Sequence, residues 1–154
     1  MSYQIHDEPE RSGLNHLAVR PVWPLFGVMF AGSWLAFPWF AFNGFALGCP
    51  QRIRTLVAAV IGFVGSFLIT SLIFFLAAMY DWDKYMIRYA LSVLLLWKLG
   101  LAYYLLTLQS RTFQLYEYFD GKTRNGIFVV FLAYYLLRPR LIDELNAFWL
   151  YVVL

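Results

Sequence analysis

The stretch Met86–Gln109, MIRYALSVLLLWKLGLAYYLLTLQ, decides the fold, because it is a long apolar run with one lysine, Lys98, near its middle. At 1.5 Å per residue, a helix over this run is about 36 Å long, whereas the hydrocarbon core of a bilayer is about 30 Å thick. The run therefore predicts a transmembrane helix.

The composition of the whole chain agrees with this interpretation. Of the 154 residues, 62% are hydrophobic and 14% are charged, against about 45–50% and about 25% in soluble domains. A soluble domain of this size cannot bury so much apolar surface, because small domains leave much of their surface exposed. We therefore expect an all-α integral membrane protein whose main surroundings are the lipid bilayer.

Four hydrophobic helical segments are expected after a polar N-terminal tail at residues 1–19. The remainder, residues 20–154, forms one transmembrane domain, and the segments cover about 21–47, 55–79, 86–109 and 127–154. The second segment carries no charge. Between the third and fourth segments, residues 110–126 mix aromatic and charged side chains, which predicts a short helix lying in the membrane interface and ending at Asp120-Gly121.

The first segment is irregular. It is about 40 Å long as a helix, enough for a tilted span, but Pro38 predicts a kink and Gly32-Ser33 a second weak point. The segment is thus either one kinked span or a re-entrant hairpin. Length favours the span, whereas re-entry collects more of the lysines and arginines on one side of the membrane. Asn43, near the inner end, is expected to cap a helix end.

The last segment is also irregular. Ile127–Leu137 is about 16 Å long as a helix, which is too short to span, and the charged residues Arg138, Arg140, Asp143 and Glu144 follow it. One kinked helix with charges in its outer half explains this pattern. A broken helix whose charges line a cavity explains it equally, because irregular backbone inside a membrane must be shielded from lipid. In either case loops 48–54 and 110–126 are expected to be cytoplasmic and loop 80–85 external.

A resemblance rests on the first segment and its exit. Phe30-Ala31-Gly32-Ser33, Leu35-Ala36, Asn43 and Leu47-Gly48 are similar to the pattern F-L-G-x-P-L-A, then asparagine, then L-G, of small bacterial membrane proteins of unknown function. Trp34 stands where that pattern has proline. The stretch YEYFDGKTRNG at 116–126 resembles their loop before the last helix. The resemblance implies a bacterial cytoplasmic membrane and no particular activity.

Lys98 is the first candidate for a functional residue. A charge near the bilayer centre costs at least about 2.5–3.5 kcal/mol, so Lys98 must face protein, water or an acidic partner. We expect a structural pair with Asp143 or Glu144. The alternative is a substrate, ion or proton site.

The charged patch itself consists of Arg138, Arg140, Asp143 and Glu144. Arg140 lies three and four residues before the two carboxylates, a spacing that allows ion pairs on one helix. We therefore expect the patch to neutralise itself. The alternative is a ring of charge around a pore or a docking point for another subunit.

Small residues mark one further site. Gly62, Gly65 and Ser66 are expected to let helices approach closely, with packing inside the chain favoured over a dimer contact. The lone Cys49 excludes an intramolecular disulfide, and His6 and His16 lack nearby ligands, so no metal site is expected. No nucleotide loop or catalytic triad is present, and the net charge of +3 includes no basic run. We expect no cofactor and no nucleic-acid partner.

These observations predict a non-enzymatic membrane subunit that acts through self-association or association with partner proteins. The alternative is a small homo-oligomeric channel or transporter, with Lys98 and the patch Arg138–Glu144 lining its path. An enzyme acting on a lipid ranks third, because residue types that carry chemistry are scarce in this chain.

Overall fold

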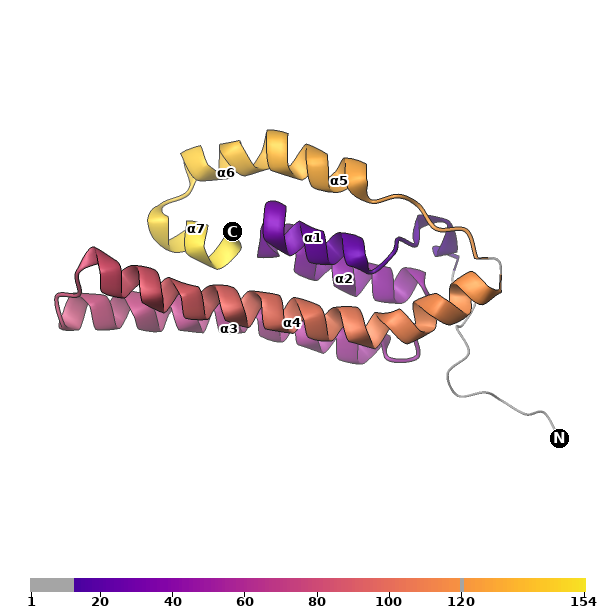
Figure 1. Ribbon diagram of the computed structural model, residues 1–154, viewed down its shortest axis with the longest axis horizontal. Helices are drawn as coiled ribbons and strands as arrows, with labels where there is room; N and C mark the ends of the chain where they lie inside the picture. The colour runs from indigo at the N-terminus through magenta and orange to yellow at the C-terminus, as the bar shows by residue number, and fades with distance from the viewer. Residues whose placement is uncertain (1–12, 120) are drawn as a thin grey trace.

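The computed structural model describes residues 13–119 and 121–154, and these residues form an all-α fold (Figure 1). The expected tail is thus described only from Gly13, and His6 and Asp120 lie outside the described residues. The helices follow one another in the order η1 (Asn15–Leu17), α1 (Val22–Phe30), α2 (Ser33–Ala46), α3 (Arg52–Met79), α4 (Lys84–Tyr118), α5 (Ile127–Leu132), η2 (Ala133–Leu137), α6 (Arg138–Glu144) and α7 (Ala147–Val153).

Helices α3 and α4 form a long antiparallel hairpin (Figure 1). They have 28 and 35 residues. The carboxylate of Asp83 begins α4 by accepting a 2.8 Å hydrogen bond from the amide N of Met86. In the described part of the chain these two helices have the length and apolar composition to cross a membrane. Four such segments are predicted from the sequence, and the structure differs because the first and last segments are each broken into shorter helices.

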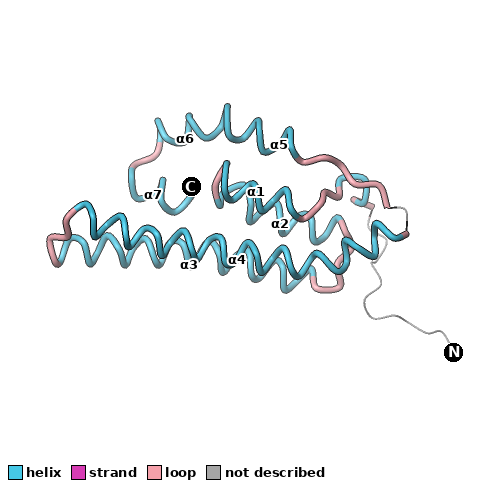
Figure 2. Tube along the Cα trace, in the orientation of Figure 1, coloured by secondary structure: helices cyan, strands magenta, loops and turns pink. Residues whose placement is uncertain are grey.

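The first segment folds as a helical hairpin, in which α1 packs against α2. The turn lies at Ala31-Gly32, where Gly32 has a φ of 110°, a conformation that side-chain-bearing residues rarely adopt (Figure 2). The helices lie close together at Gly27, where a Cβ would be in ordinary van der Waals contact with that of Ala36, at 3.5 Å. Pro38 does not break the segment but lies inside α2.

The last segment remains helical through its charged residues and breaks after them. The sequence Ile127–Glu144 runs as α5, a π-helical turn (η2) and α6. The wide turn directly precedes Pro139, whose ring would clash with the carbonyl four residues earlier in a regular α-helix. The break follows at Leu145-Asn146, and Asn146 starts α7 by accepting a 3.1 Å hydrogen bond from the amide N of Trp149. Helix α7 then folds back along α3.

The separate interfacial helix expected at residues 110–126 is absent from the described residues, because α4 continues to Tyr118. Gln109 and Thr112 extend the buried face of α4, so packing against the rest of the fold carries the helix onward. Beyond its end, the amide N of Gly121 donates a 2.9 Å hydrogen bond to the carbonyl of Tyr116.

Small and polar residues line the buried faces of both long helices, whereas large apolar side chains face outward. On α3 the buried residues are Thr55, Ala58, Ala59, Gly62, Ser66, Thr70 and Ile73. On α4 they are Leu94, Lys98, Ala102, Leu105, Gln109 and Thr112. The exposed side includes Val60, Val64, Phe67, Leu68, Leu72, Val93, Leu95 and Leu96.

The predicted small positions on α3 contact other helices of the same chain. A Cβ added to Gly62 would lie 2.7 Å from Leu101 and 2.8 Å from Phe37, and one added to Gly65 would lie 2.4 Å from Trp97. Ser66 donates a 2.7 Å hydrogen bond to the carbonyl of Gly62. This face is therefore occupied by α2 and α4 and is not free for a second copy.

Candidate functional site

The two breaks in the fold bring helix ends together beside the middle of α4. There, the tip of the α1–α2 hairpin meets α6 and the last turn of α7. We call this region the junction and define it by Phe30, Gly32, Ser33, Lys98 and Arg138.

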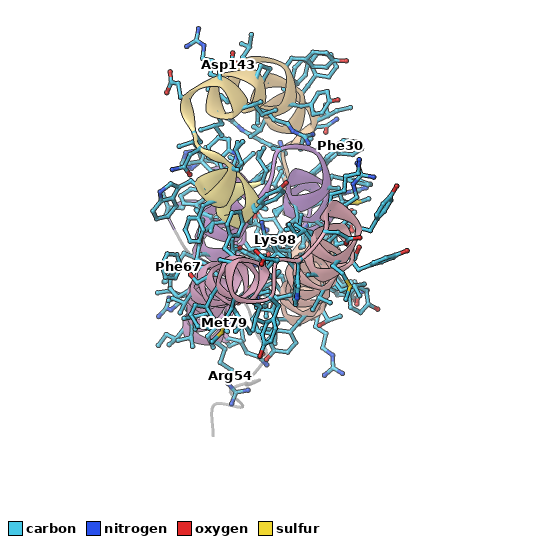
Figure 3. All side chains as sticks on the ribbon, turned by 90° about the vertical axis from the view of Figure 1, so that its left-hand side faces the viewer. Phe30, Arg54, Phe67, Met79, Lys98 and Asp143 are labelled. Atoms are coloured by element: carbon cyan, nitrogen blue, oxygen red, sulfur yellow. The ribbon has the colours of Figure 1, made fainter. Side chains whose placement is uncertain are left out.

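Lys98 lies in the interior of the junction, with 3% of its surface exposed. Its Nζ donates hydrogen bonds to the carbonyl oxygens of Tyr151, at 2.6 Å, and Val152, at 3.1 Å. The expected pair with Asp143 or Glu144 is not formed. Figure 3 shows Lys98 among the helices and Asp143 on the outer side of α6, so the amine reaches the backbone of α7 and not a carboxylate.

Ser33 and Gly32 complete the contact with α7. The fully buried hydroxyl of Ser33 lies 2.7 Å from the carbonyl oxygen of Val153 and 3.0 Å from that of Val152, and its one hydrogen is shared between them. A Cβ added to Gly32 would lie 2.8 Å from the carbonyl oxygen of Val153. Glycine is thus required twice here, for the backbone conformation and for the close approach of α7.

Arg138 contacts the other helix end. Its Nη1 donates a 2.9 Å hydrogen bond to the carbonyl oxygen of Phe30, in the last turn of α1, and its guanidinium carbon lies 5.4 Å from the ring centroid of Tyr134. The indole Nε1 of Trp34 donates a 2.8 Å hydrogen bond to the carbonyl of Ala31. Side chains therefore donate hydrogen bonds to two carbonyls at the first break, where the helix offers no partner of its own.

Lys98 and Arg138 also line one pocket, between α4 and the α6–α7 turn. Its volume is about 360 Å³, and its other lining residues are Leu91, Leu94, Leu95, Ala147, Leu150, Tyr151 and Leu154. Two cations thus share a small, otherwise largely apolar space.

The positive charge at the junction is offset only in part. No ion pair joins Lys98 or Arg138 to a carboxylate among residues 13–119 and 121–154. The carbonyl ends of α7 and α1, to which Lys98 and Arg138 bond, each supply at most about half a negative elementary charge. The beginning of α2 lies here as well and adds partial positive charge. An anion in the pocket would therefore be favoured, because uncompensated charge in a medium of low dielectric constant is costly.

The rest of the charged patch does not behave as expected. Arg140, Asp143 and Glu144 are exposed on α6, and the ion pairs predicted for Arg140 do not form within the described chain. The patch is instead divided, because Arg138 turns toward the bundle and the other three turn away. At exposed positions water solvates each charge, so little is gained by pairing.

A second polar cluster joins α2 to α4. Asn43 is fully buried inside α2; its Oδ1 accepts a 2.9 Å hydrogen bond from the amide N of Val19, and its Nδ2 donates to Gln109 Oε1 at 3.0 Å. The Nε2 of Gln109 donates in turn to the carbonyl of Phe40 at 2.6 Å. Asn43 is thus a cross-link between helices and not the helix cap expected from the sequence.

Gln109 was not among the residues selected from the sequence. A signal for it exists, because Lys98, Ala102, Leu105, Gln109 and Thr112 recur at spacings of three and four residues. Such a stripe of small and polar residues in an apolar helix marks the face that packs against protein.

No protein-family model, curated protein or solved structure matches this chain. In the described part of the chain, no group of three or more His, Cys, Asp or Glu residues is placed to hold a metal ion. The junction and its pocket are therefore the candidate functional site of the described chain.

Proposed function

We propose that this chain is an integral membrane protein whose junction binds an amphipathic anion and carries it across the bilayer. The observation that supports this most is the pocket shared by Lys98 and Arg138, which lies beside broken helices and in which neither cation pairs with a carboxylate of the described residues. Broken helices and intramembrane charges mark binding sites in many transporters.

Membrane placement is supported by the two long helices and by their surfaces. Helices of 28 and 35 residues are about 42 and 52 Å long, more than the thickness of a bilayer core. Their exposed faces are large and apolar, while Lys98, Gln109, Ser66 and Thr70 are buried. Such a distribution, with apolar side chains outside and polar side chains inside, is favourable in lipid and unfavourable in water.

The proposed topology follows from the first hairpin. If α1–α2 re-enters, Arg20 lies on the same side as Arg52, Arg54 and loop 110–126, whereas Lys84 and Arg88 lie on the other side. This excess of basic residues makes the first side cytoplasmic by the positive-inside rule. The resemblance noted above favours a bacterial inner membrane.

The ligand class follows from the pocket. Lys98 and Arg138 would bind an anionic head, and Leu94, Leu95 and Leu150 would contact a short apolar chain. A suitable probe is octanesulfonate, which stays anionic at every accessible pH. All these residues belong to one chain, so the site requires no symmetry axis between copies.

The test is uptake of octanesulfonate into liposomes containing the purified protein. Lys98→Gln keeps hydrogen-bond donors but removes the charge, and we expect uptake to fall about tenfold, as for loss of one charge-assisted hydrogen bond. The matched control is Lys84→Gln, because Lys84 is exposed at the start of α4. Equal uptake by both variants would exclude a role for Lys98 in transport.

A membrane subunit acting by association is the second candidate. It is favoured by the outer helix α5–η2–α6, whose Phe128 and Phe131 are 81% and 60% exposed and whose α6 makes few contacts with the bundle. The mass of the complex in lipid nanodiscs tests it. A defined oligomer or a stoichiometric partner supports association, and a monomer contradicts it.

A further inference from the structure

A second pocket lies between α2 and residues 124–129. Its volume is about 610 Å³. Its lining combines side chains of α2 with the segment that leads into α5: Leu17, Val19, Trp34, Leu35, Pro38, Trp39, Phe42, Arg124, Asn125, Gly126 and Val129. We call it the α2 groove. Lys98 and Arg138 do not line it.

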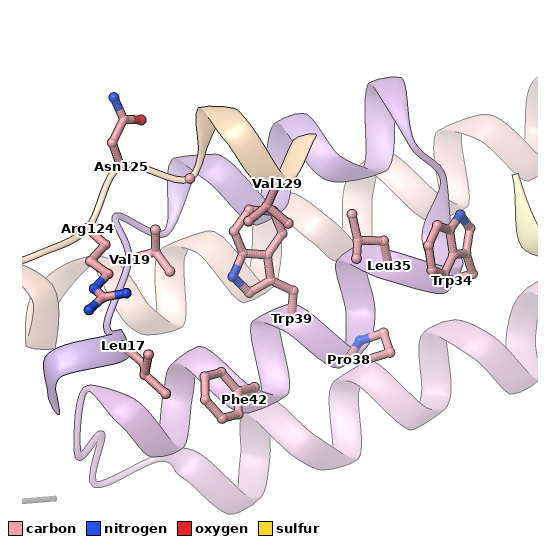
Figure 4. A pocket seen from close by; sticks show the side chains of 11 residues that line it. Leu17, Val19, Trp34, Leu35, Pro38, Trp39, Phe42, Arg124, Asn125 and Val129 are labelled. Atoms are coloured by element: carbon pink, nitrogen blue, oxygen red, sulfur yellow. The ribbon is translucent and has the colours of Figure 1, made fainter. Parts of the chain in front are cut away.

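The α2 groove is polar at one end and apolar at the other (Figure 4). Arg124 and Asn125 lie at the polar end, and the indole nitrogen of Trp39 is turned toward it. Leu35 and Trp34 lie at the far end, toward the tip of the α1–α2 hairpin. From Phe42 to Trp34, α2 rises about 12 Å, so the groove leads inward from the basic end.

The backbone fixes the basic end in place. The amide N of Arg124 donates a 2.9 Å hydrogen bond to the carbonyl of Ala18, and Val19 and Arg124 form a parallel β-bridge. Gly126 allows this segment to lie close to α1 and α2, since an added Cβ would lie 2.7 Å from Trp23 and 3.0 Å from Trp39. The Arg124 side chain itself is exposed. No ion pair joins it to a carboxylate within the described residues.

We propose that the α2 groove binds one anionic phospholipid, with the phosphate at Arg124 and an acyl chain along Trp39, Leu35 and Trp34. A guanidinium binds the phosphate of any phospholipid through charge-assisted hydrogen bonds. Charge complementarity favours an anionic headgroup, because Arg124 has no carboxylate partner among the described residues and the cationic choline of a zwitterionic lipid would repel it. The order of polar and apolar residues matches that of a lipid in the cytoplasmic leaflet. This inference rests on the membrane placement proposed above, but it does not depend on anion transport at the junction.

The experiment uses the full chain in nanodiscs containing equal amounts of dioleoyl phosphatidylglycerol and dioleoyl phosphatidylcholine. The protein is extracted into detergent, and native mass spectrometry measures the lipid that each chain retains. We expect one phosphatidylglycerol per chain, retained about tenfold more than phosphatidylcholine. Arg124→Gln should abolish this preference. The control Arg54→Gln removes another exposed arginine, at the start of α3, and this variant should keep the preference for phosphatidylglycerol.

A second variant tests the apolar half. Leu35→Trp fills the groove but keeps Arg124, so retention of phosphatidylglycerol should fall although the charge is unchanged. Equal retention of the two lipids by the wild-type chain, or an unchanged preference in Arg124→Gln, would overturn the proposal. The Lys98→Gln variant separates this proposal from transport, because it should retain phosphatidylglycerol whether or not octanesulfonate uptake is lost.

Discussion

Gly32 carries the turn between α1 and α2 in a conformation that only glycine adopts readily. Its φ is 110°, and a Cβ at this position would lie 2.8 Å from the carbonyl oxygen of Val153. We expect Gly32→Ala to lower the free energy of unfolding by about 2–3 kcal/mol, since backbone strain adds to a steric clash. Denaturant titration of the purified protein in detergent, followed by circular dichroism, measures this loss.

The matched control is Gly100→Ala, because nothing lies within 4 Å of a Cβ added there. This change should be neutral or stabilising by up to about 1 kcal/mol, as alanine favours a helix interior. A loss of stability in Gly100→Ala equal to that in Gly32→Ala would contradict the special role of the turn.

Ser33 gives a second prediction at this scale. Ser33→Ala should cost about 1–2 kcal/mol, because it leaves buried carbonyls of α7 with one donor fewer. Ser71→Ala is the control, since Ser71 bonds to the carbonyl of Phe67 in its own helix. The same unfolding titration applies, and equal effects of the two changes would show that α7 does not depend on Ser33.

The reaction rate of the Cys49 thiol tests whether the turn before α3 is buried. Cys49 is 2% exposed, and burial raises the pKa of its thiol above the ordinary value, although a hydrogen bond with Thr112 opposes this shift. Less thiolate is then present at pH 8, so we expect N-ethylmaleimide to react at least about tenfold more slowly than with an exposed cysteine. The reference is Pro50→Cys in a Cys49→Ser background, and equal rates would contradict a buried thiol.

The sequence identifies residues at the junction more readily than their partners. The cost of a charge in the bilayer predicts that Lys98 faces protein, water or an acidic partner, and the structure buries it among helices of the chain. Its partners are carbonyls of Tyr151 and Val152, which become available only where α7 ends. Backbone acceptors carry no mark in the sequence, whereas the carboxylates of Asp143 and Glu144 do, so the sequence predicts a carboxylate partner.

At the scale of elements, one polar cross-link fixes the position of α2 against α4. Asn43 and Gln109 bond to each other at 3.0 Å and are both fully buried. A double-mutant cycle with Asn43→Ala and Gln109→Ala should give a coupling free energy of about 1–2 kcal/mol, measured by denaturant unfolding. Additive losses would mean that the two side chains act independently.

The two long helices were predictable because each contains a predominantly apolar run of membrane-spanning length. The ends of these helices were harder to predict. The helix expected to end at Gln109 continues to Tyr118, because Thr112 packs against the rest of the fold. The first break was predicted at two places, Gly32-Ser33 and Pro38, and the chain turns at the glycine. Proline constrains a helix but does not turn it back, whereas a positive φ reverses the chain direction. The second break lies at Asn146, which caps α7. The sequence predicts the irregularity at the charged residues before Asn146 and not at Asn146 itself.

At the scale of the whole molecule, composition predicts an all-α chain but does not predict how many helices span. The described residues contain two helices of spanning length, and the other apolar segments form hairpins beside them. Hydropathy alone cannot separate a helix that crosses from one that turns back, because both consist of similar residues. The contacts of Val19 with Asn43 and Arg124 show that the chain before α1 lies beside the last part of α2, an arrangement that hydropathy does not reveal.

In the proposed topology the α1–α2 hairpin enters and leaves the membrane on one side, which brings its tip to Lys98. Single cysteines at Gly13, Asp83 and Lys122, all exposed positions, are introduced into a Cys49→Ser background. A membrane-impermeant maleimide is then applied to intact cells. We predict labelling at position 83 alone, with positions 13 and 122 labelled only after the membrane is opened. Labelling of positions 13 and 83 together in intact cells would mean that the first segment spans the membrane, and would contradict the account.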